Sequence, residues 1–481
     1  MAEQELGIWR RPGGLREVLW LSFPLVISTA STTLLQFTDR LFLVQYSQDA
    51  MAAALPAGAL QWTIMSFAFG IAMYVNTFVA QYSGAERPQR IGVAVWQGIL
   101  LGLAATPVLL ATIFVAPWFF AQAGHTPEVQ TLEIEYFQIL MLGGPAQVMA
   151  AAISAFYTGR GKTGVVMYVN MFAAVLNVVL DYFWIFGIAG HEGWGIAGAA
   201  WATVVSYWVV LGIWFALFLQ AGHRRDFATW PAKLFDGELF RRLVRFGAPQ
   251  GLQFAVEIGG FSLFLMIVGR LGALELAATG LALNVNMLAF MPALGIAIAA
   301  ETLVGQRIGE KQPDLAARST WSAFTLALIY TFGVGIVYFF FGDLLLILHG
   351  AHLEDPESFG PLRDMTVMLL KFVAIYCLFD SANIVFSFAI KGAGDTRFVL
   401  KTTFLMSGMP VVATWVGIEK FGLGLRWSWF VLTIWILALG VIYLLRFLAG
   451  YWREMQVIEH QVPELESPSG ESALTPCPND A

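Results

Sequence analysis

Five carboxylic acids interrupt long apolar stretches of this sequence, where an ionised side chain is costly. They are Asp39, Asp181, Glu257, Glu301 and Asp380. An acid at the centre of a lipid bilayer costs roughly 2.5–3.5 kcal/mol of insertion free energy, so a structural role alone rarely justifies it. Acids in such positions usually line a water-filled path and bind a cation or a proton. The sequence therefore predicts cation or proton chemistry inside a membrane.

The first half of the chain carries a predicted ion-coupling set, made of Asp39, Asn177, Asp181 and Thr203. Asn177 and Asp181 are four residues apart, so they share one face of a helix, and Asn170 lies on the same face. Two carboxylates, an amide oxygen and a hydroxyl suit a small cation such as Na⁺, or a carboxyl pair that shares a proton. Hydrogen bonding between packed helices is the alternative reading, above all for Asn170 and Thr203.

The second half carries a predicted ion or substrate site at Glu257 and Asp380, with Na⁺ again a candidate ligand. Each acid lies near the centre of its apolar stretch, with no Lys or Arg within a helical turn. An unpaired buried acid is either protonated or bound to a cation. Asn284 could add an oxygen ligand to this site. Glu301 lies nearer the end of its stretch. Two interpretations are equally open for it: a functional role, or a side chain that simply extends to the membrane interface.

Composition places all these residues on membrane-spanning helices. Of the 481 residues, 58% are hydrophobic and only 12% are charged, and the mean hydropathy is +0.68. Continuous apolar runs without strand-like alternation favour helices over a barrel. The predicted fold class is an all-α polytopic membrane protein with twelve transmembrane helices in two pseudo-symmetric six-helix lobes. The spans are expected near 18–46, 51–80, 93–121, 133–157, 163–189, 196–221, 243–271, 276–305, 317–348, 365–391, 397–419 and 426–451.

An internal repeat divides the chain into two halves. Its first copy is Gly70-Ile-Ala…Thr77…Gln81…Gly84, and its second, 225 residues later, is Gly295-Ile-Ala…Thr302…Gln306…Gly309. Six spans per half predict two parallel repeats with a substrate site between them. The expected domains are a cytoplasmic N-terminus 1–17, an N-terminal lobe 18–221, a cytoplasmic linker 222–242, a C-terminal lobe 243–451 and a cytoplasmic tail 452–481, predicted to be disordered.

The distribution of basic residues predicts the orientation in the membrane. If both termini are cytoplasmic, 21 of the 27 Lys and Arg residues lie in cytoplasmic segments. Short cytoplasmic loops carry an excess of Lys and Arg, so this asymmetry supports an even number of spans. The expected location is the plasma (inner) membrane, crossed many times, with the N- and C-termini cytoplasmic.

The sequence resembles the multidrug and toxic compound extrusion (MATE) family over about residues 15–450. The first-half motifs are Phe37-Thr-Asp39, Val79-Ala-Gln81…Gly84-Ala85, Leu176-Asn177…Leu180-Asp181-Tyr182 and Gly195-Ile-Ala-Gly198…Thr203. The second-half motifs are Pro249…Glu257, Ala282-Leu-Asn284-Val and Asp380…Lys391-Gly392-Ala-Gly394-Asp395-Thr396. Together these motifs are specific, whereas each alone is weak.

The resemblance implies export of organic cations or other drugs, driven by inward Na⁺ or H⁺. It places Asp39, Asn177, Asp181 and Thr203 in the N-terminal ion site of the family. Glu257 and Asp380 match acids that the NorM branch keeps in its C-terminal lobe, so a NorM-like protein is expected. Two residues depart from the family pattern: Arg40 replaces a small or hydroxyl residue, and Lys391 stands where Arg is more usual.

The expected function is a secondary active multidrug antiporter that works by alternating access of its two lobes. Pro24 is a candidate hinge, because proline removes one helical hydrogen bond, and a static kink is the alternative. The expected partners are lipophilic cationic drugs and the lipid bilayer, with no nucleic acid and no cofactor other than the coupling ion. We expect a monomer.

Two rival functions remain. A flippase for lipid-linked oligosaccharide or peptidoglycan precursors belongs to the same broader superfamily, but it usually needs cationic cavity residues for the pyrophosphate. A membrane enzyme needs a His or metal constellation, and the six histidines fall in predicted loops or in the tail. We therefore expect no enzymatic activity.

Overall fold

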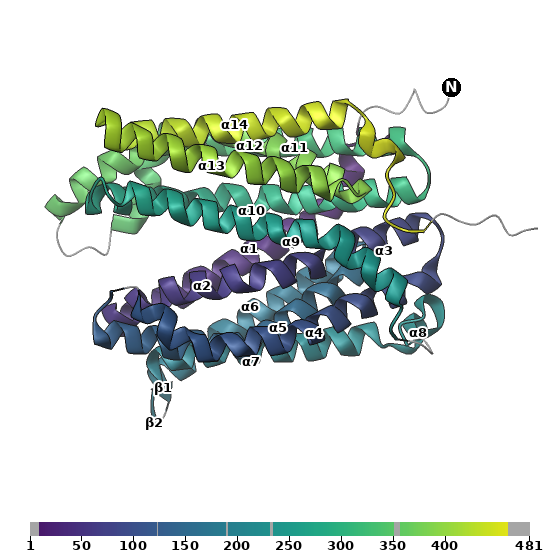
Figure 1. The fold of residues 1–481 in the computed structure, drawn as a ribbon, viewed down its shortest axis with the longest axis horizontal. Helices are drawn as coiled ribbons and strands as arrows, with labels where there is room; N and C mark the ends of the chain where they lie inside the picture. The colour runs from purple at the N-terminus through teal and green to yellow at the C-terminus, as the bar shows by residue number, and fades with distance from the viewer. Residues whose placement is uncertain (1–8, 123, 189–190, 231–233, 351–355, 460–481) are drawn as a thin grey trace, which may run out of the picture.

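Twelve helices of the computed structural model are long and apolar enough to cross a membrane, which confirms the predicted fold class (Figure 1). The structure describes residues 9–122, 124–188, 191–230, 234–350 and 356–459. Most of the predicted tail, from residue 460 on, lies outside the described residues. The domain limits that we placed within the described chain stay a prediction.

The helices form two bundles, which we call the N-lobe and the C-lobe. The N-lobe contains α1 (Leu15–Tyr46), α2 (Gln48–Met73), α3 (Val75–Gly84), α4 (Pro88–Ala121), α5 (Pro127–Thr158), α6 (Thr163–Phe186) and α7 (Gly195–Phe218). The C-lobe contains α9 (Gly237–Val268), α10 (Ala273–Gly309), α11 (Pro313–Gly350), α12 (Pro356–Ala393), α13 (Thr396–Phe421) and α14 (Leu425–Leu448). The short helix α8 (Ala221–Phe227) follows the N-lobe, and the 3₁₀ helix η1 (Tyr451–Glu454) follows α14.

The connections between helices define two ends of the molecule. At the linker end lie α8 and the turns 85–87, 159–162, 310–312 and 394–395. At the hairpin end, the two-residue strands β1 (Gly187–Ile188) and β2 (His191–Glu192) pair antiparallel between α6 and α7. The two lobes lie against each other at the linker end, and their ribbons separate toward the hairpin end (Figure 1).

Several helices begin earlier than their apolar runs predict, and proline explains four of the starts. Pro88, Pro127, Pro313 and Pro356 each occupy the first position of a helix. Proline suits this position because its missing N–H would have no partner there and its φ is already helical. The span predicted near 51–80 is one candidate span, Gln48–Gly84, in which α2 ends at Met73 and α3 begins at Val75.

The same pairs of helices pack in both lobes, as the sequence repeat predicts. In the N-lobe α4 packs on α5, α5 on α7 and α1 on α6; in the C-lobe α11 packs on α12, α12 on α14 and α9 on α13. Helix α10 corresponds to α2 and α3 together. Each lobe has a main hydrophobic cluster, with Phe156 and Trp214 in the N-lobe and Trp429 in the C-lobe. The clusters also reach across the interface, since Leu239 of α9 belongs to the N-lobe cluster and Val18 of α1 packs with C-lobe residues.

The two copies of the repeat motif touch each other across the lobe interface. Asn76 donates a hydrogen bond to Thr302, at 3.1 Å, and Thr77 donates one to Glu301, at 2.9 Å. These contacts are reciprocal, because positions 76 and 77 of the first copy correspond to 301 and 302 of the second, 225 residues later. A surface that meets its own repeat in this way has two-fold symmetry.

Glycines allow the backbones to meet at this interface. A Cβ atom on Gly70 would lie 2.6 Å from the Cα atom of Gly251, and one on Gly295 would lie 2.9 Å from the Cα atom of Val26. Nearer the linker end, a Cβ atom on Gly84 would overlap the backbone of Gln306, and one on Gly309 would overlap that of Gln81. The interface therefore tolerates no side chain at these four glycines.

We predict that Gly84→Ala destabilises the protein by about 1–3 kcal/mol, because its methyl group collides with backbone that cannot rotate away. Thermal unfolding of the purified protein in detergent measures the change. Gly164→Ala is the matched control, since a Cβ atom there meets nothing within 4 Å. Equal midpoints for the two variants would contradict the packing described here.

Candidate functional site

The N-lobe acids lie on α1 and α6, two helices that pack against each other toward the hairpin end. Asp39 is on α1, Asn177 and Asp181 are on α6, and Thr203 is on α7. Asn177 and Asp181 are 0% exposed, and Thr203 is 8% exposed. Asn177 donates a hydrogen bond to the Thr203 hydroxyl at 3.4 Å. The structure thus gathers the four residues of the predicted ion-coupling set in one region.

Four oxygen atoms of this set are buried and accept no hydrogen bond within the described residues. They are Oδ1 of Asp39, Oδ1 of Asn177 and both carboxylate oxygens of Asp181. A buried acceptor without a partner is unfavourable by about 1–3 kcal/mol, and more when it is charged. A bound cation, a proton or water would satisfy these atoms. The donor set therefore fits a small hard cation or shared protons.

Tyr136 on α5 also belongs to this group, although it was not among the predicted residues. Its hydroxyl donates to Oδ2 of Asp39 at 3.5 Å, and it interacts electrostatically with Asp39 and Asp181. The negative charges of Asp39 and Asp181 also repel each other. A single tyrosine in an apolar run usually belongs to the core, so the sequence held no signal that could have distinguished it.

Asn170 takes a structural partner instead of joining the ion-coupling set. Its amide donates a hydrogen bond of 2.5 Å to the Ser28 hydroxyl, which ties α6 to α1. This is the packing role that the sequence left open for Asn170. Pro24 lies in α1 near this contact, and α1 runs through it as one continuous helix. A hinge at Pro24 stays a prediction.

The C-lobe acids have partners on their own helices. Glu257 accepts a hydrogen bond from Gln253 at 2.9 Å, and Asp380 accepts one from Asn383 at 2.9 Å. The charges of Glu257 and Asp380 repel each other. Among the described residues, no hydrogen bond or ion pair joins these two carboxylates directly.

A small cavity inside the C-lobe opens beside Glu257. Its lining includes Glu257, Phe261, Phe264, Ser407, Pro410 and Trp435. The indole N–H of Trp435 is buried and has no hydrogen-bond partner in the described chain. An acid surrounded by aromatic rings can bind an organic cation by charge, by apolar contact and by cation–π attraction.

Asn284 takes part in a contact between the two lobes. Its amide oxygen accepts a hydrogen bond of 3.3 Å from Arg40 of the N-lobe. Both side chains are exposed and lie toward the hairpin end. No hydrogen bond links Asn284 to Glu257 or Asp380 in the described residues, and its role as a C-lobe ligand stays a prediction.

A buried lysine links the C-lobe acids to the lobe interface. Lys391 is 0% exposed, its Nζ atom has no hydrogen-bond partner in the described chain, and it lies 3.6 Å from the centre of the Phe388 ring. Its charge is attracted to Glu257 and to Glu301. Glu301 in turn holds Thr77 of the other lobe. Charge at Glu257 is therefore connected electrostatically to a contact that joins the lobes.

The internal repeat of the sequence carries a signal for this contact. Thr77 and Thr302 occupy equivalent positions of the repeat, and Glu301 stands where the first copy has Asn76. A two-fold axis through the motif brings such positions together. The role of Glu301, which the sequence left open, is thus at least that of an interface residue.

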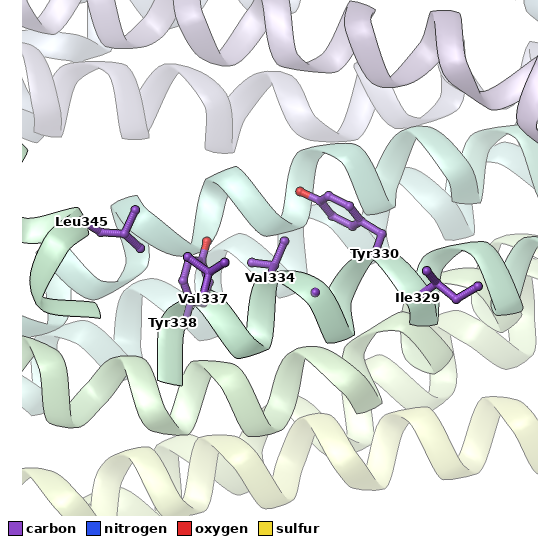
Figure 2. Close-up of a pocket in the computed structure, with 7 residues that line it drawn as sticks. Ile329, Tyr330, Val334, Val337, Tyr338 and Leu345 are labelled. Carbon is purple, nitrogen blue, oxygen red and sulfur yellow. The ribbon is translucent and has the colours of Figure 1, made fainter. Parts of the chain in front are cut away.

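A second recess lies on α11 and carries no charge. Ile329, Tyr330, Val334, Val337, Tyr338 and Leu345 line it (Figure 2). Its lining is almost wholly apolar, so it cannot by itself attract a cation. No group of three or more His, Cys, Asp or Glu side chains gathers in the described part of the chain. The candidate cation sites are thus pairs of carboxylates with neutral oxygens or aromatic rings around them.

Comparison with known proteins gives a consistent result over nearly the whole chain. The sequence model of the MatE family matches residues 24–183 and 249–416, which is more than half of the chain. A probable multidrug resistance protein NorM from Thermotoga maritima is 26% identical over 460 residues, covering 93% of this chain and 95% of that protein. The multidrug resistance protein MdtK of Cronobacter sakazakii is 25% identical and covers 90% and 95%.

Solved structures share the fold. A transporter of the MOP superfamily from Pyrococcus furiosus superposes with a TM-score of 0.82 at 20% identity, covering 93% of this chain and 98% of that one. A eukaryotic MATE transporter superposes with a TM-score of 0.81 at 18% identity, covering 91% and 96%. At these identities the likeness establishes the fold alone.

The charge relation between Lys391 and Glu301 predicts a compensating pair of substitutions. Lys391→Met alone should lower stability by about 1–3 kcal/mol, because it leaves buried Glu301 without its nearest positive charge. The double variant Lys391→Met with Glu301→Gln should recover much of that loss. Thermal unfolding in detergent measures both, and a double variant that is less stable than the single one would disprove the pairing.

Proposed function

This chain belongs to the MatE family, and we propose that it is an efflux transporter that exports organic cations or other amphipathic drugs in exchange for Na⁺ or H⁺. It is a multi-pass membrane protein, in agreement with its twelve candidate spans. The observation that carries the proposal is the group of unpartnered buried oxygens on Asp39, Asn177 and Asp181. We place the protein in the inner membrane, as a monomer.

The N-lobe set is the proposed coupling site. Its four free oxygens can accept a cation, and its two repelling carboxylates gain stability when one of them takes a proton or both face a cation. Thr203 holds Asn177 in place by its hydroxyl, so that the amide oxygen of Asn177 stays available. This arrangement suits Na⁺ and H⁺ equally, and we propose that one of them enters here.

The side chains around the C-lobe cavity are the proposed contacts for a drug cation. The cavity itself, with a volume of about 10 Å³, holds no more than a water molecule, so the lobe must open here before a drug can enter. Glu257 offers the negative charge, and Phe261, Phe264 and Trp435 offer aromatic surface. Because Gln253 already occupies one oxygen of Glu257, an arriving cation must compete with or share that hydrogen bond. Weak, broad recognition of this kind suits a protein that handles many substrates.

Transport then requires the lobes to part at the linker end and to close at the hairpin end. The prediction that Lys- and Arg-rich segments are cytoplasmic makes the linker end the cytoplasmic one. The contacts Thr77–Glu301 and Asn76–Thr302 must break when that end opens. Binding of the ion and of the drug must favour different arrangements of the lobes, since coupling between two sites is reciprocal. Bending of α1 at Pro24 is one way to accommodate the change.

The flippase alternative lacks a supporting observation. A pyrophosphate group needs a cluster of cationic side chains, whereas Lys391 is the one fully buried Lys or Arg side chain among the residues described. Its charge is already directed to Glu301 and Glu257. We therefore keep drug export as the proposal.

Neutralising either N-lobe acid should strongly slow ion-driven transport. In proteoliposomes loaded with ethidium, a fluorescent organic cation, Na⁺ and pH gradients are imposed separately. We predict that Asp39→Asn and Asp181→Asn each slow gradient-driven ethidium flux by about tenfold or more, the size of a typical coupling between sites. The gradient that drives the wild type identifies the coupling ion.

Asp49→Asn is the matched control, because Asp49 is an exposed acid in the first turn of α2. It should transport like the wild type. If Asp39→Asn and Asp181→Asn both left ethidium flux unchanged under either gradient, the assignment of the N-lobe coupling site would be wrong.

A further inference from the structure

The segment after the last transmembrane helix leaves the C-lobe and crosses to the N-lobe at the linker end. Trp452 anchors its start in the C-lobe, because its ring stacks on that of Phe447 with centroids 4.9 Å apart. Farther along, Val457 and Ile458 are 0% and 1% exposed and belong to the hydrophobic cluster of the N-lobe, which also includes Leu239 and Leu243 at the start of α9. Residues 455–459 therefore contact both lobes.

Gln81 holds the middle of this segment. Its side-chain oxygen accepts a hydrogen bond of 2.9 Å from the Val457 backbone N–H. Its side-chain nitrogen donates to the backbone carbonyls of Gly392, at 3.0 Å, and Ala393, at 3.3 Å. One N-lobe residue thus binds both the segment and the end of α12 in the C-lobe.

Glu459 fixes the end of the segment to the N-lobe. Its carboxylate accepts a hydrogen bond of 2.6 Å from the Tyr82 hydroxyl and one of 3.1 Å from Nε of Arg90. Arg87 donates to its backbone carbonyl at 3.1 Å and lies 3.7 Å from its carboxylate. Asp236 also binds Arg90, at 3.0 Å, so Arg90 keeps an anionic partner when Glu459 leaves.

We propose that residues 455–459 form a releasable strap, the C-terminal strap, which holds the two lobes together at the linker end and must detach before that end opens. The proposal rests on the alternating access proposed above. The strap follows the last helix of the bundle, so it can leave the N-lobe without unwinding a membrane span. Local opening of this kind needs only the loss of the strap's own contacts.

The strap differs from a tail that is merely packed against the surface. Its apolar residues are buried among N-lobe residues while Trp452 stays in the C-lobe. Arg242 of α9 also donates a hydrogen bond of 3.3 Å to the Val457 carbonyl, so separation of the lobes must break the strap's contacts with one side or the other. Its charged contacts lie at its far end, where Glu459 is 29% exposed and water can replace them. The buried contacts therefore stabilise the closed state, and the partly exposed Glu459 is where the strap can begin to detach.

Truncation tests the strap directly. One variant ends at Glu454 and lacks the strap, and the control variant ends at Glu459 and keeps it. Spin labels are attached at Gln89→Cys in the N-lobe and Gln312→Cys in the C-lobe, both exposed at the linker end, with Cys377 and Cys477 replaced by alanine. Double electron–electron resonance of the purified protein then reports the distance between the lobes.

We predict that the variant ending at Glu454 shifts this distance toward longer values, with at least about a tenfold rise in the ratio of open to closed molecules. The control ending at Glu459 should match the full chain. Equal distance distributions for the two truncations would overturn the strap. This measurement needs no transported substrate, so it remains informative even if ethidium transport, and with it the proposed function, fails.

Point variants cover the case in which the shorter truncation does not fold. Glu459→Gln keeps the shape of the side chain but loses its charge, and Tyr82→Phe removes one hydrogen bond from the N-lobe side. Each should increase the open fraction by a smaller factor than the truncation. Unchanged distances in both point variants and a fully folded truncation with closed lobes would each reject the proposal.

Acid should release the strap. Burial by itself would raise the pKa of Glu459, but the hydrogen bond from Tyr82 and the charges of Arg90 and Arg87 outweigh it and hold that pKa below its ordinary value. A detached Glu459 regains an ordinary pKa of about 4.3. The stabilisation of the attached strap by the Glu459 carboxylate is therefore complete above that pH and is lost as the pH falls below it.

We therefore predict that the wild type and Glu459→Gln differ in open fraction by a constant factor from pH 8 to 5, and that the difference shrinks below about pH 4.3. Asp236, whose pKa is also lowered, titrates in both proteins and cancels in the comparison. A difference that grew on acidification would show that the Glu459 carboxylate does not hold the strap in place.

Discussion

The backbones of α3 and of the last turns of α10 meet at the linker end without side chains between them. Gly84 lies against the backbone of Gln306, and Gly309 lies against that of Gln81. This close approach fixes the angle between the lobes, because neither helix can rotate or slide without bringing a side chain into contact. It also explains why the repeat motif holds glycine at matching positions of its two copies. The hydrogen bonds of Thr77 and Asn76 then lock the register of the contact.

The acids of the two lobes differ in how their oxygens are satisfied. In the C-lobe, Glu257 and Asp380 each accept a hydrogen bond from an amide side chain within one turn of the same helix. In the N-lobe, both oxygens of Asp181 and one of Asp39 have no partner in the described chain. An unsatisfied buried acceptor is costly, so the N-lobe set has the greater need of a ligand. The C-lobe acids can instead rest without one.

The linker end gathers three kinds of interaction into one region. Glycine contacts set the geometry, Thr77 and Glu301 join the lobes by a hydrogen bond, and the segment 455–459 crosses from one lobe to the other. Lys391 stands behind Glu301 and is attracted by Glu257 as well. A change of charge at Glu257 therefore changes the electrostatic potential at Lys391, which is also attracted to Glu301 at the lobe interface. Such a connection is what coupling between a binding site and a lobe movement requires.

The sequence by itself determined the twelve spans, the two-lobed repeat and the five acids within apolar stretches, but it did not single out Glu133, which is 0% exposed. Hydropathy depends only on residues that are neighbours in the chain, and a repeat is found by comparing positions along it. Both can therefore be recognised without knowing the fold. Pro88 and Pro313 also mark helix starts in the sequence. The first turns after them are polar, however, so apolar runs alone place these starts too late.

Only the tertiary structure decided which side chains meet. The rotation of each helix about its axis decides which side chains from distant parts of the sequence come together. It brings Tyr136 to Asp39, Asn284 to Arg40 and Glu301 to Thr77. The same holds for Glu459, which finds Tyr82 across the molecule, at a separation of 377 residues. A periodic pattern gives the face on which a residue lies, but packing of the whole bundle selects the partner on the opposing face.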